Sequence, residues 1–173
     1  MKASRLLLHL CWALPTAALA LYVINPAGVP TWDPRGRLLG VIPYRVPADS
    51  MAPTIRNGSL VAACTWAYVR STPERGDVIV FRPPHDPATP YLKRVVGLAG
   101  EEVRLEDGKL FIDGVLQEEP YTHPHDSMDE VFSATVPDAH VFVAGDNRSR
   151  SYDSRHFGPI PLSDVVGKVC GSL

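Results

Sequence analysis

Ser50 lies in a segment that could present a nucleophilic hydroxyl on a rigid turn, PADSMAPT over residues 47–54. It follows an apolar run, residues 38–46, and precedes Pro53, which prevents an ordinary helix from starting there. A serine hydroxyl becomes a good nucleophile only when a neighbouring base removes its proton. Taken alone, the segment is equally well explained as a plain turn, so a candidate base is needed.

Lys93 is that candidate, because it lies inside a strand-like apolar segment, YLKRVVGLAG over residues 91–100. A lysine can act as a base near neutral pH only if its pKa falls by about 2 to 3 units, and burial has this effect. Strand alternation predicts that Lys93 shares an apolar face with Tyr91 and Val95, while Arg94 lies on the opposite face. The alternative is a lysine that protects an exposed sheet edge.

The histidines offer two other kinds of site. His156 stands three residues after Asp153 and could belong to a Ser/His/Asp triad, although such a pair within one loop is more often a surface hydrogen bond. His123, His125 and Asp126 could hold a metal, but a proline separates the histidines and no third ligand follows at standard spacing. We therefore expect no metal and no cofactor.

A third segment, VFVAGDNRSRSYDSR over residues 141–155, completes a set of three motifs. In this order the motifs resemble those of type I signal peptidases, membrane-bound Ser/Lys endopeptidases that remove signal peptides, and the resemblance covers residues 41 to about 166. It implies that Ser50 is the nucleophile and Lys93 the general base. It also implies that Ser151 supplies a hydroxyl that orients the lysine amine, and that Asp153 and Arg155 form a pair that stiffens the site.

The resemblance further implies substrates: exported preproteins with small residues one and three positions before the cut, bound beside a strand. Ala48 departs from the many members that have a hydroxyl residue two positions before the nucleophile, so the oxyanion would rely on the backbone N–H of Ser50. Two alternatives stay open: a pilin-maturing transfer peptidase of the same superfamily, and a membrane-tethered β-domain that binds peptides without cutting them. A self-cleaving Ser/Lys repressor peptidase shares this chemistry, but the N-terminal apolar segment, the motif over residues 145–155 and the lack of an internal Ala-Gly cleavage site with a DNA-binding half argue against it.

Composition indicates a β-rich protein without a nucleic-acid partner. The 173 residues include 17 basic and 19 acidic side chains, for a net charge of −2, which gives no electrostatic basis for binding a polyanion. The 17 prolines and 13 glycines divide the chain into short segments. The expected fold is a mostly antiparallel β-sheet or partly closed barrel, with one N-terminal transmembrane helix.

The expected organisation is a membrane anchor over residues 1–24, a connector over 25–37 and a β-rich peptidase domain over 38–173. Apolar runs predict strands, and two Asp-Gly turns, at 107–108 and 113–114, predict a meander of hairpins. Residues 118–138 are polar and predict an excursion from the sheet.

The anchor prediction rests on residues 6–24, which contain no Asp, Glu, Lys or Arg and would span roughly 28 Å as a helix. Lys2 and Arg5 favour a cytoplasmic N-terminal end (residues 1–5), with the catalytic domain periplasmic or extracytoplasmic and in contact with membrane lipid. The alternative is a cleavable signal peptide ending at Ala18-Leu19-Ala20.

The cysteines leave one question open. Cys11 lies in the apolar N-terminal segment, so Cys64 and Cys170 could form a disulfide in an extracytoplasmic domain. Their spacing in the sequence does not indicate whether they form a disulfide, and free, buried thiols are the favoured interpretation.

Overall fold

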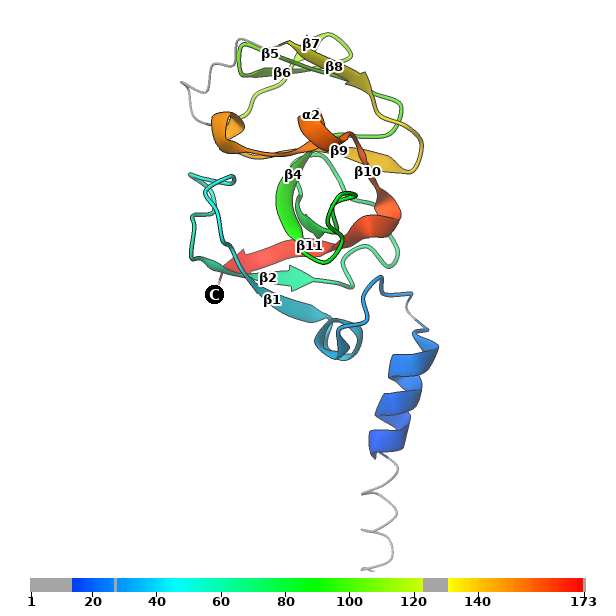
Figure 1. Cartoon of the computed structure of the whole chain (residues 1–173). Helices are drawn as coiled ribbons and strands as arrows, with labels where there is room; N and C mark the ends of the chain where they lie inside the picture. Colours follow the sequence, from blue (N-terminus) through cyan, green and yellow to red (C-terminus); the bar gives the residue numbers. More distant parts are fainter. Residues whose placement is uncertain (1–13, 27, 123–130, 173) are drawn as a thin grey trace, which may run out of the picture.

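The structure is a computed structural model that describes residues 14–26, 28–122 and 131–172. Figure 1 shows a β body made of two sheets, with a helix projecting from it on the N-terminal side. The prediction of a mostly antiparallel β fold is confirmed.

The larger sheet has seven strands in the order β1-β2-β11-β3-β4-β9-β10, and every neighbouring pair is antiparallel. Its strands are β1 (Val41–Arg45), β2 (Leu60–Cys64), β3 (Val78–Phe81), β4 (Tyr91–Gly97), β9 (His140–Ala144), β10 (Ile160–Pro161) and β11 (Val165–Ser172). The C-terminal strand β11 lies inside the order, between β2 and β3, so the C-terminal segment completes the sheet.

The smaller sheet has four strands in the order β7-β6-β5-β8. They are β5 (Glu102–Glu106), β6 (Lys109–Ile112), β7 (Val115–Leu116) and β8 (Phe132–Thr135). Both Asp-Gly hairpins form as predicted: Asp107 and Gly108 have φ of 49° and 71°, and Asp113 and Gly114 have 51° and 79°. Positive φ at both central residues matches the twist of tightly turned hairpins, which explains why Asp-Gly occurs here.

The predicted excursion over residues 118–138 was wrong in part, because Phe132–Thr135 form β8 and pair with β5. The strand is short and follows a polar stretch. Its aromatic residue, Phe132, is the one feature of its sequence that indicates a buried strand. Phe132 packs against Phe142 with 5.5 Å between ring centroids, which ties β8 to the core. The alternative metal ligands His123, His125 and Asp126 lie outside the described residues.

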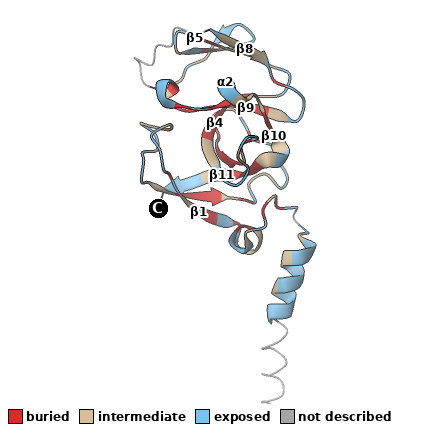
Figure 2. Cartoon of the chain, viewed as in Figure 1, coloured by how far each residue is buried: buried red, intermediate tan, exposed pale blue. Residues whose placement is uncertain are grey.

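The core has a layer between the two sheets and further layers on the larger sheet (Figure 2). The first layer contains Val96, Val103, Phe142 and Ala144, among others. Val95, next to Val96 in β4, packs in a different layer with Phe81 and Val143. This alternation along β4 confirms the period of two that the sequence predicts.

A disulfide joins Cys64 at the end of β2 to Cys170 in β11, with 5.9 Å between the Cα atoms. The favoured interpretation of free thiols was wrong. The pairing depends on β11 lying beside β2, and a sequence separation of 106 residues gives no indication of that neighbourhood.

Residues 14–24 are helical, and Arg37 holds the end of this helix to the connector. Arg37 donates to the Tyr22 carbonyl at 2.8 Å, and its guanidinium lies 3.9 Å from the Trp32 ring centre. Within the described ranges, none of the helices has the length and apolarity needed to cross a membrane. The first part of the predicted span, residues 6–13, lies outside those ranges.

Candidate active site

Ser50 lies on a turn just after β1, and the turn is held from two sides. Met51 is fully buried and anchors the segment in the body. The Ser50 carbonyl accepts a hydrogen bond of 3.1 Å from the Asn147 backbone N–H. The Asn147 side chain donates at 3.2 Å to the Asp49 carbonyl. The loop after β9 therefore fixes the backbone that carries the candidate nucleophile.

Lys93 lies in the middle of β4 and points at Ser50. Its Nζ donates to Ser50 Oγ at 2.9 Å and to the Leu92 carbonyl at 3.1 Å. Lys93 pairs with Ile79 of β3, and only 5% of the residue is exposed. The two groups that the sequence selected, 43 positions apart, are thus within hydrogen-bonding distance.

Burial lowers the pKa of Lys93 to about 8, because desolvation penalises the charged ammonium. The carboxylates of Asp153 and Asp146 act in the opposite direction, and the guanidinium of Arg155 acts in the same direction as burial. An amine with this pKa is partly neutral near pH 7, as a general base requires.

Asp153 and Arg155 form a buried ion pair at the start of helix α2 (Ser154–Phe157), where Asp153 is the N-cap. Arg155 donates to both carboxylate oxygens, at 2.7 and 2.9 Å, and Asp153 also accepts from the Gly145 N–H at 3.0 Å. Burial by itself would raise the pKa of Asp153, but the hydrogen bonds and charge of Arg155 outweigh it and lower the pKa. The pair joins the end of β9 to α2.

Ser151 is buried beside Gly145. A Cβ atom added to Gly145 would lie closer than 3.0 Å to both Ser151 Oγ and the Ser50 carbonyl oxygen. Gly145 therefore lets the loop approach the nucleophile turn closely. In the described part of the chain, no hydrogen bond joins Ser151 to Lys93.

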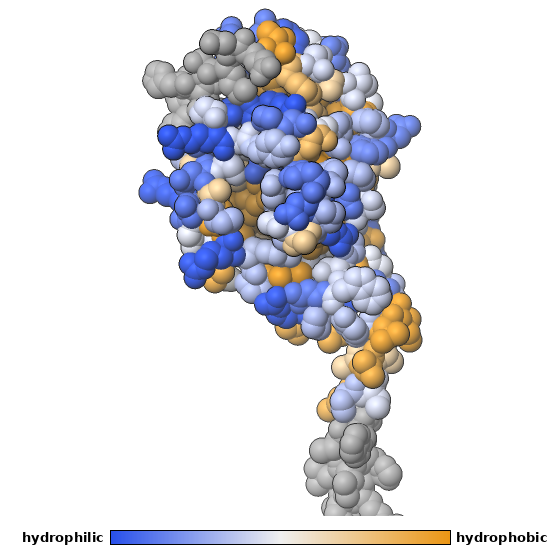
Figure 3. Space-filling view, in the orientation of Figure 1, coloured by the Kyte–Doolittle hydropathy of each residue, from blue (hydrophilic) through white to orange (hydrophobic). Residues whose placement is uncertain are grey.

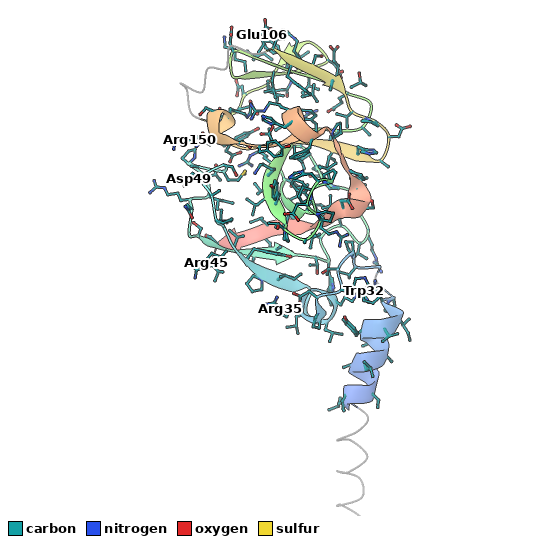
Figure 4. All side chains as sticks on the ribbon, viewed as in Figure 1. Trp32, Arg35, Arg45, Asp49, Glu106 and Arg150 are labelled. Atoms are coloured by element: carbon teal, nitrogen blue, oxygen red, sulfur yellow. A yellow bond between two sulfur atoms is a disulfide. The ribbon has the colours of Figure 1, made fainter. Side chains whose placement is uncertain are left out.

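A cavity of about 320 Å³ opens beside Ser50 and Lys93. Its lining comes from β1, the nucleophile turn, β4 and the loop after β9, and includes Tyr44, Ala48, Leu92, Arg150 and Tyr152. Figure 3 shows that the visible face is hollowed near its middle, with apolar surface inside and hydrophilic side chains around it. Figure 4 labels Arg45, Asp49 and Arg150 along the same side of the body. An extended peptide could reach the Ser50 hydroxyl from this cavity.

The family model described as "Signal peptidase, peptidase S26" matches residues 35–172, which include every candidate site residue named in this subsection. The chain belongs to this signal peptidase family.

Its relatives include Thylakoidal processing peptidase 1 of Arabidopsis thaliana, 35% identical over 136 residues, which are 73% of this chain and 40% of the relative. Signal peptidase I of Bacillus caldolyticus is 35% identical over 139 residues, 73% of this chain and 75% of the relative. The crystal structure of a signal peptidase I from Enterococcus faecalis V583 matches with a TM-score of 0.51 and 34% identity, covering 57% of this chain and 97% of that one. The chain thus spans well under half the length of the Arabidopsis relative.

In this signal peptidase family member, His156 does not contact Ser50. Its ring accepts from the Asp153 backbone N–H at 3.4 Å and packs against the Tyr152 ring in a tilted arrangement, with 4.7 Å between centroids. His156 thereby completes a capping box at the start of α2. The hydrogen bond to Ser50 Oγ comes from Lys93 instead.

Two further ion pairs beside the site were not assigned from sequence. Arg94 donates to both carboxylate oxygens of Asp146, at 2.8 and 2.7 Å. Arg148 pairs with Glu119, and only 1% of the Arg148 side chain is exposed. Asp146 and Arg148 belong to the Gly-Asp-Asn-Arg motif, which was the available signal, whereas Glu119 lies in the stretch that the sequence assigns to the polar excursion.

Proposed function

We propose that this chain is a Ser/Lys endopeptidase that removes N-terminal signal peptides from exported preproteins. One observation carries the proposal: the buried Lys93 amine lies 2.9 Å from the Ser50 hydroxyl. The lowered pKa of Lys93, about 8, supports a neutral amine as the base. Membership of the signal peptidase family supports the choice of substrate class.

The proposed reaction has two halves. Ser50 Oγ attacks the carbonyl carbon of the scissile peptide bond while Lys93 Nζ takes the hydroxyl proton. The C–N bond then breaks, the proton passes from Lys93 to the leaving amine, and an acyl-enzyme remains. Lys93 next removes a proton from water, the hydroxide attacks the ester carbonyl, and release of the carboxylic acid returns the proton to Ser50.

The Ser50 backbone N–H is the proposed oxyanion donor. Within the described residues this N–H makes no hydrogen bond, so it is available to a developing oxyanion. Ala48 lines the cavity but has no hydroxyl to contribute. Ser151 is proposed to act as a hydroxyl partner of the neutral amine during turnover, and the Asp153–Arg155 pair to hold the loop that carries it.

The proposed substrate preference rests on the cavity beside the two groups and on the family of the chain. The cavity lining is largely apolar and contains no carboxylate. An apolar lining suits extended peptides with apolar side chains, and membership of the signal peptidase family supports small residues, such as alanine, one and three positions before the cut. Binding beside β4 would add backbone hydrogen bonds that do not depend on sequence.

The decisive experiment compares cleavage of a signal-bearing preprotein by the wild type and by Ser50→Ala, Lys93→Ala and His156→Ala. Loss of product formation is expected for the first two variants, and retention for the third. A cleaving Lys93→Ala protein would overturn the mechanism. A wild type that binds the preprotein but neither cuts it nor reacts with a serine-acylating inhibitor would instead identify a peptide-binding domain without catalysis.

We further propose that residues 6–24 anchor the protein in the membrane, with the β body on the extracytoplasmic side. The apolar sequence of this segment and the basic residues that precede it support this. An anchor would confine enzyme and preprotein to one surface and raise their effective concentration. A reporter fused after Leu173 is expected outside the cytoplasm, and cytoplasmic reporter activity would contradict the proposed topology.

A further inference from the structure

Glu119 and Tyr121 lie outside the three sequence motifs, yet both contact buried arginines beside the candidate site. Glu119 pairs with the NH2 group of Arg148, and its Oε1 also accepts a hydrogen bond of 2.9 Å from the Tyr121 hydroxyl. Only 6% of the Glu119 side chain and 1% of the Arg148 side chain are exposed. Removing the carboxylate would therefore leave a guanidinium in a buried site without this counter-charge.

The Tyr121 ring covers the second arginine. The Arg94 guanidinium carbon lies 4.0 Å from the ring centre, within the range of a cation–π contact, which is strongest when the cation is desolvated. Arg94 is 9% exposed and holds Asp146 through two hydrogen bonds. One short segment, residues 119–121, thus contacts both arginines.

The two arginines hold the start of the loop that follows β9. Arg94 fixes Asp146, and Arg148 Nε donates to the Gly145 carbonyl at 3.0 Å. Gly145 is the residue that lies against the Ser50 carbonyl and the Ser151 side chain. Any shift of Gly145 would therefore be transmitted to the backbone that carries the nucleophile.

We infer that Glu119 and Tyr121 are positioning residues, which act through Arg148 and Arg94 to hold the loop of residues 145–147 against the Ser50–Lys93 pair. The inference rests on the proposed peptidase function. The four side chains Glu119, Tyr121, Arg94 and Arg148 form what we call the arginine clamp. Because reacting atoms tolerate little displacement, loosening the clamp would lower the rate of the chemical step more than substrate binding.

The arginine clamp also bears on the protonation of Lys93. Lys93 is adjacent to Arg94 in β4, and only 5% of the residue is exposed. A displaced loop would admit water to the amine and favour its charged form. A rise in the pH at which Lys93 loses its proton would therefore accompany a fall in kcat, which lost stability alone would not produce.

The test uses the full chain in detergent micelles and a fluorogenic signal-peptide substrate with alanine one and three positions before the cut. The variants are Glu119→Gln, Tyr121→Leu and Tyr121→Phe. Glu118→Gln is the matched control, because Glu118 is the exposed neighbour of Glu119. Rates are divided by the fraction of sites that an acylating inhibitor titrates, so that unfolded protein does not count.

Glu119→Gln is expected to lower kcat by about tenfold or more with little change in KM, and to move the acidic limb of the pH–rate profile to higher pH. Tyr121→Leu should act in the same direction. Tyr121→Phe should have a smaller effect because the ring over Arg94 remains. Glu118→Gln should match the wild type.

Wild-type kcat per titrated site and an unmoved acidic limb in both Glu119→Gln and Tyr121→Leu would overturn the inference. If Glu119→Gln does not fold, Tyr121→Leu decides alone. The pKa of Lys93, followed by NMR of the labelled amine, needs no turnover: an unchanged value in Tyr121→Leu counts against the arginine clamp. Absence of cleavage by the wild type would instead refute the proposed function, so the two failures are distinguishable.

Discussion

The α-carbon of Gly145 lies so close to Ser151 that no side chain fits between them: a Cβ at position 145 would approach Ser151 Oγ to less than 3.0 Å. The same Cβ would collide with the Ser50 carbonyl oxygen. The Ser50 oxygen is a backbone atom, and Ser151 Cβ would also lie closer than 3.0 Å. Rotation of the Ser151 hydroxyl therefore would not relieve the contacts, and the loop itself would have to move.

Gly145→Ala is therefore expected to lower kcat by about a hundredfold, because displacement of reacting groups by about 1 Å has an effect of that size. The measurement is kcat per folded enzyme, with circular dichroism to confirm the fold. Gly171→Ala is the matched control, since a Cβ there meets nothing within 4 Å. Equal rates for Gly145→Ala and the wild type would show that the close approach has no role in turnover.

A second prediction concerns pH. Only neutral Lys93 can accept the Ser50 proton, and the pKa of Lys93 is about 8. The value of kcat/KM should therefore rise about tenfold per pH unit below pH 8 and level off above it, because it reports the free enzyme. Lys93→Arg should be inactive at every pH tested, since a guanidinium stays protonated. A profile that levels off near pH 6.5 would point to a histidine base instead.

Lys93 also has a predicted effect on stability. Its pKa is about 8 in the folded protein against 10.5 in the unfolded chain. Burial of the charged amine therefore destabilises the folded protein, and this effect has its full size below pH 8. Between pH 8 and 10.5 the unfolded state binds more protons, and this part of the stability rises with pH.

Lys93→Met, which shortens the side chain by one atom and removes the charge, should abolish cleavage and stabilise the protein at pH 7 by up to about 3 kcal/mol. The advantage should disappear near pH 11. Urea denaturation at both pH values measures it. Lys109→Met is the control, because Lys109 is exposed at the start of β6. A destabilised Lys93→Met protein at pH 7 would mean that the amine is not penalised by burial.

The candidate pair could be predicted from sequence because three motifs occur together and resemble one family, although each local pattern alone also fits a plain turn or an edge lysine. Pro53 marks the turn that carries Ser50, and the alternation of β4 fixes which face Lys93 occupies. The Asp-Gly hairpins were predictable for the same reason, since their backbone conformation is set within the turn. Turn conformation and strand alternation depend on residues that are neighbours in the sequence, so the sequence predicts them.

Contacts between distant segments were not predictable in this way. Glu119 and Arg148 are 29 positions apart, and no spacing rule relates them. The strand β8 forms because Phe132 packs against Phe142 in the core, although the polar residues before it resemble a loop. In both cases the fold supplies the partner, and tertiary packing overrides the local pattern.

The disulfide gives a final prediction, because Cys64 and Cys170 join two strands that are far apart in sequence. Cross-links that close loops of about 100 residues remove much of the entropy of the unfolded chain, and loss of a native disulfide typically costs about 2–5 kcal/mol. The bond ties β11, which lies between β2 and β3, to its neighbour β2. Reduction should therefore weaken the whole larger sheet.

The double variant Cys64→Ala, Cys170→Ala should unfold at a lower urea concentration than the wild type and should be insensitive to reductant. Wild-type protein treated with reductant should behave like the double variant, which separates loss of the bond from the effect of the substitutions. Folded protein should keep its kcat, because neither cysteine contributes to the cavity beside Ser50. If reductant leaves the unfolding midpoint of the wild type unchanged, the two thiols are free, and β11 is held without the disulfide by its hydrogen bonds, its core packing and the Lys168–Asp77 pair.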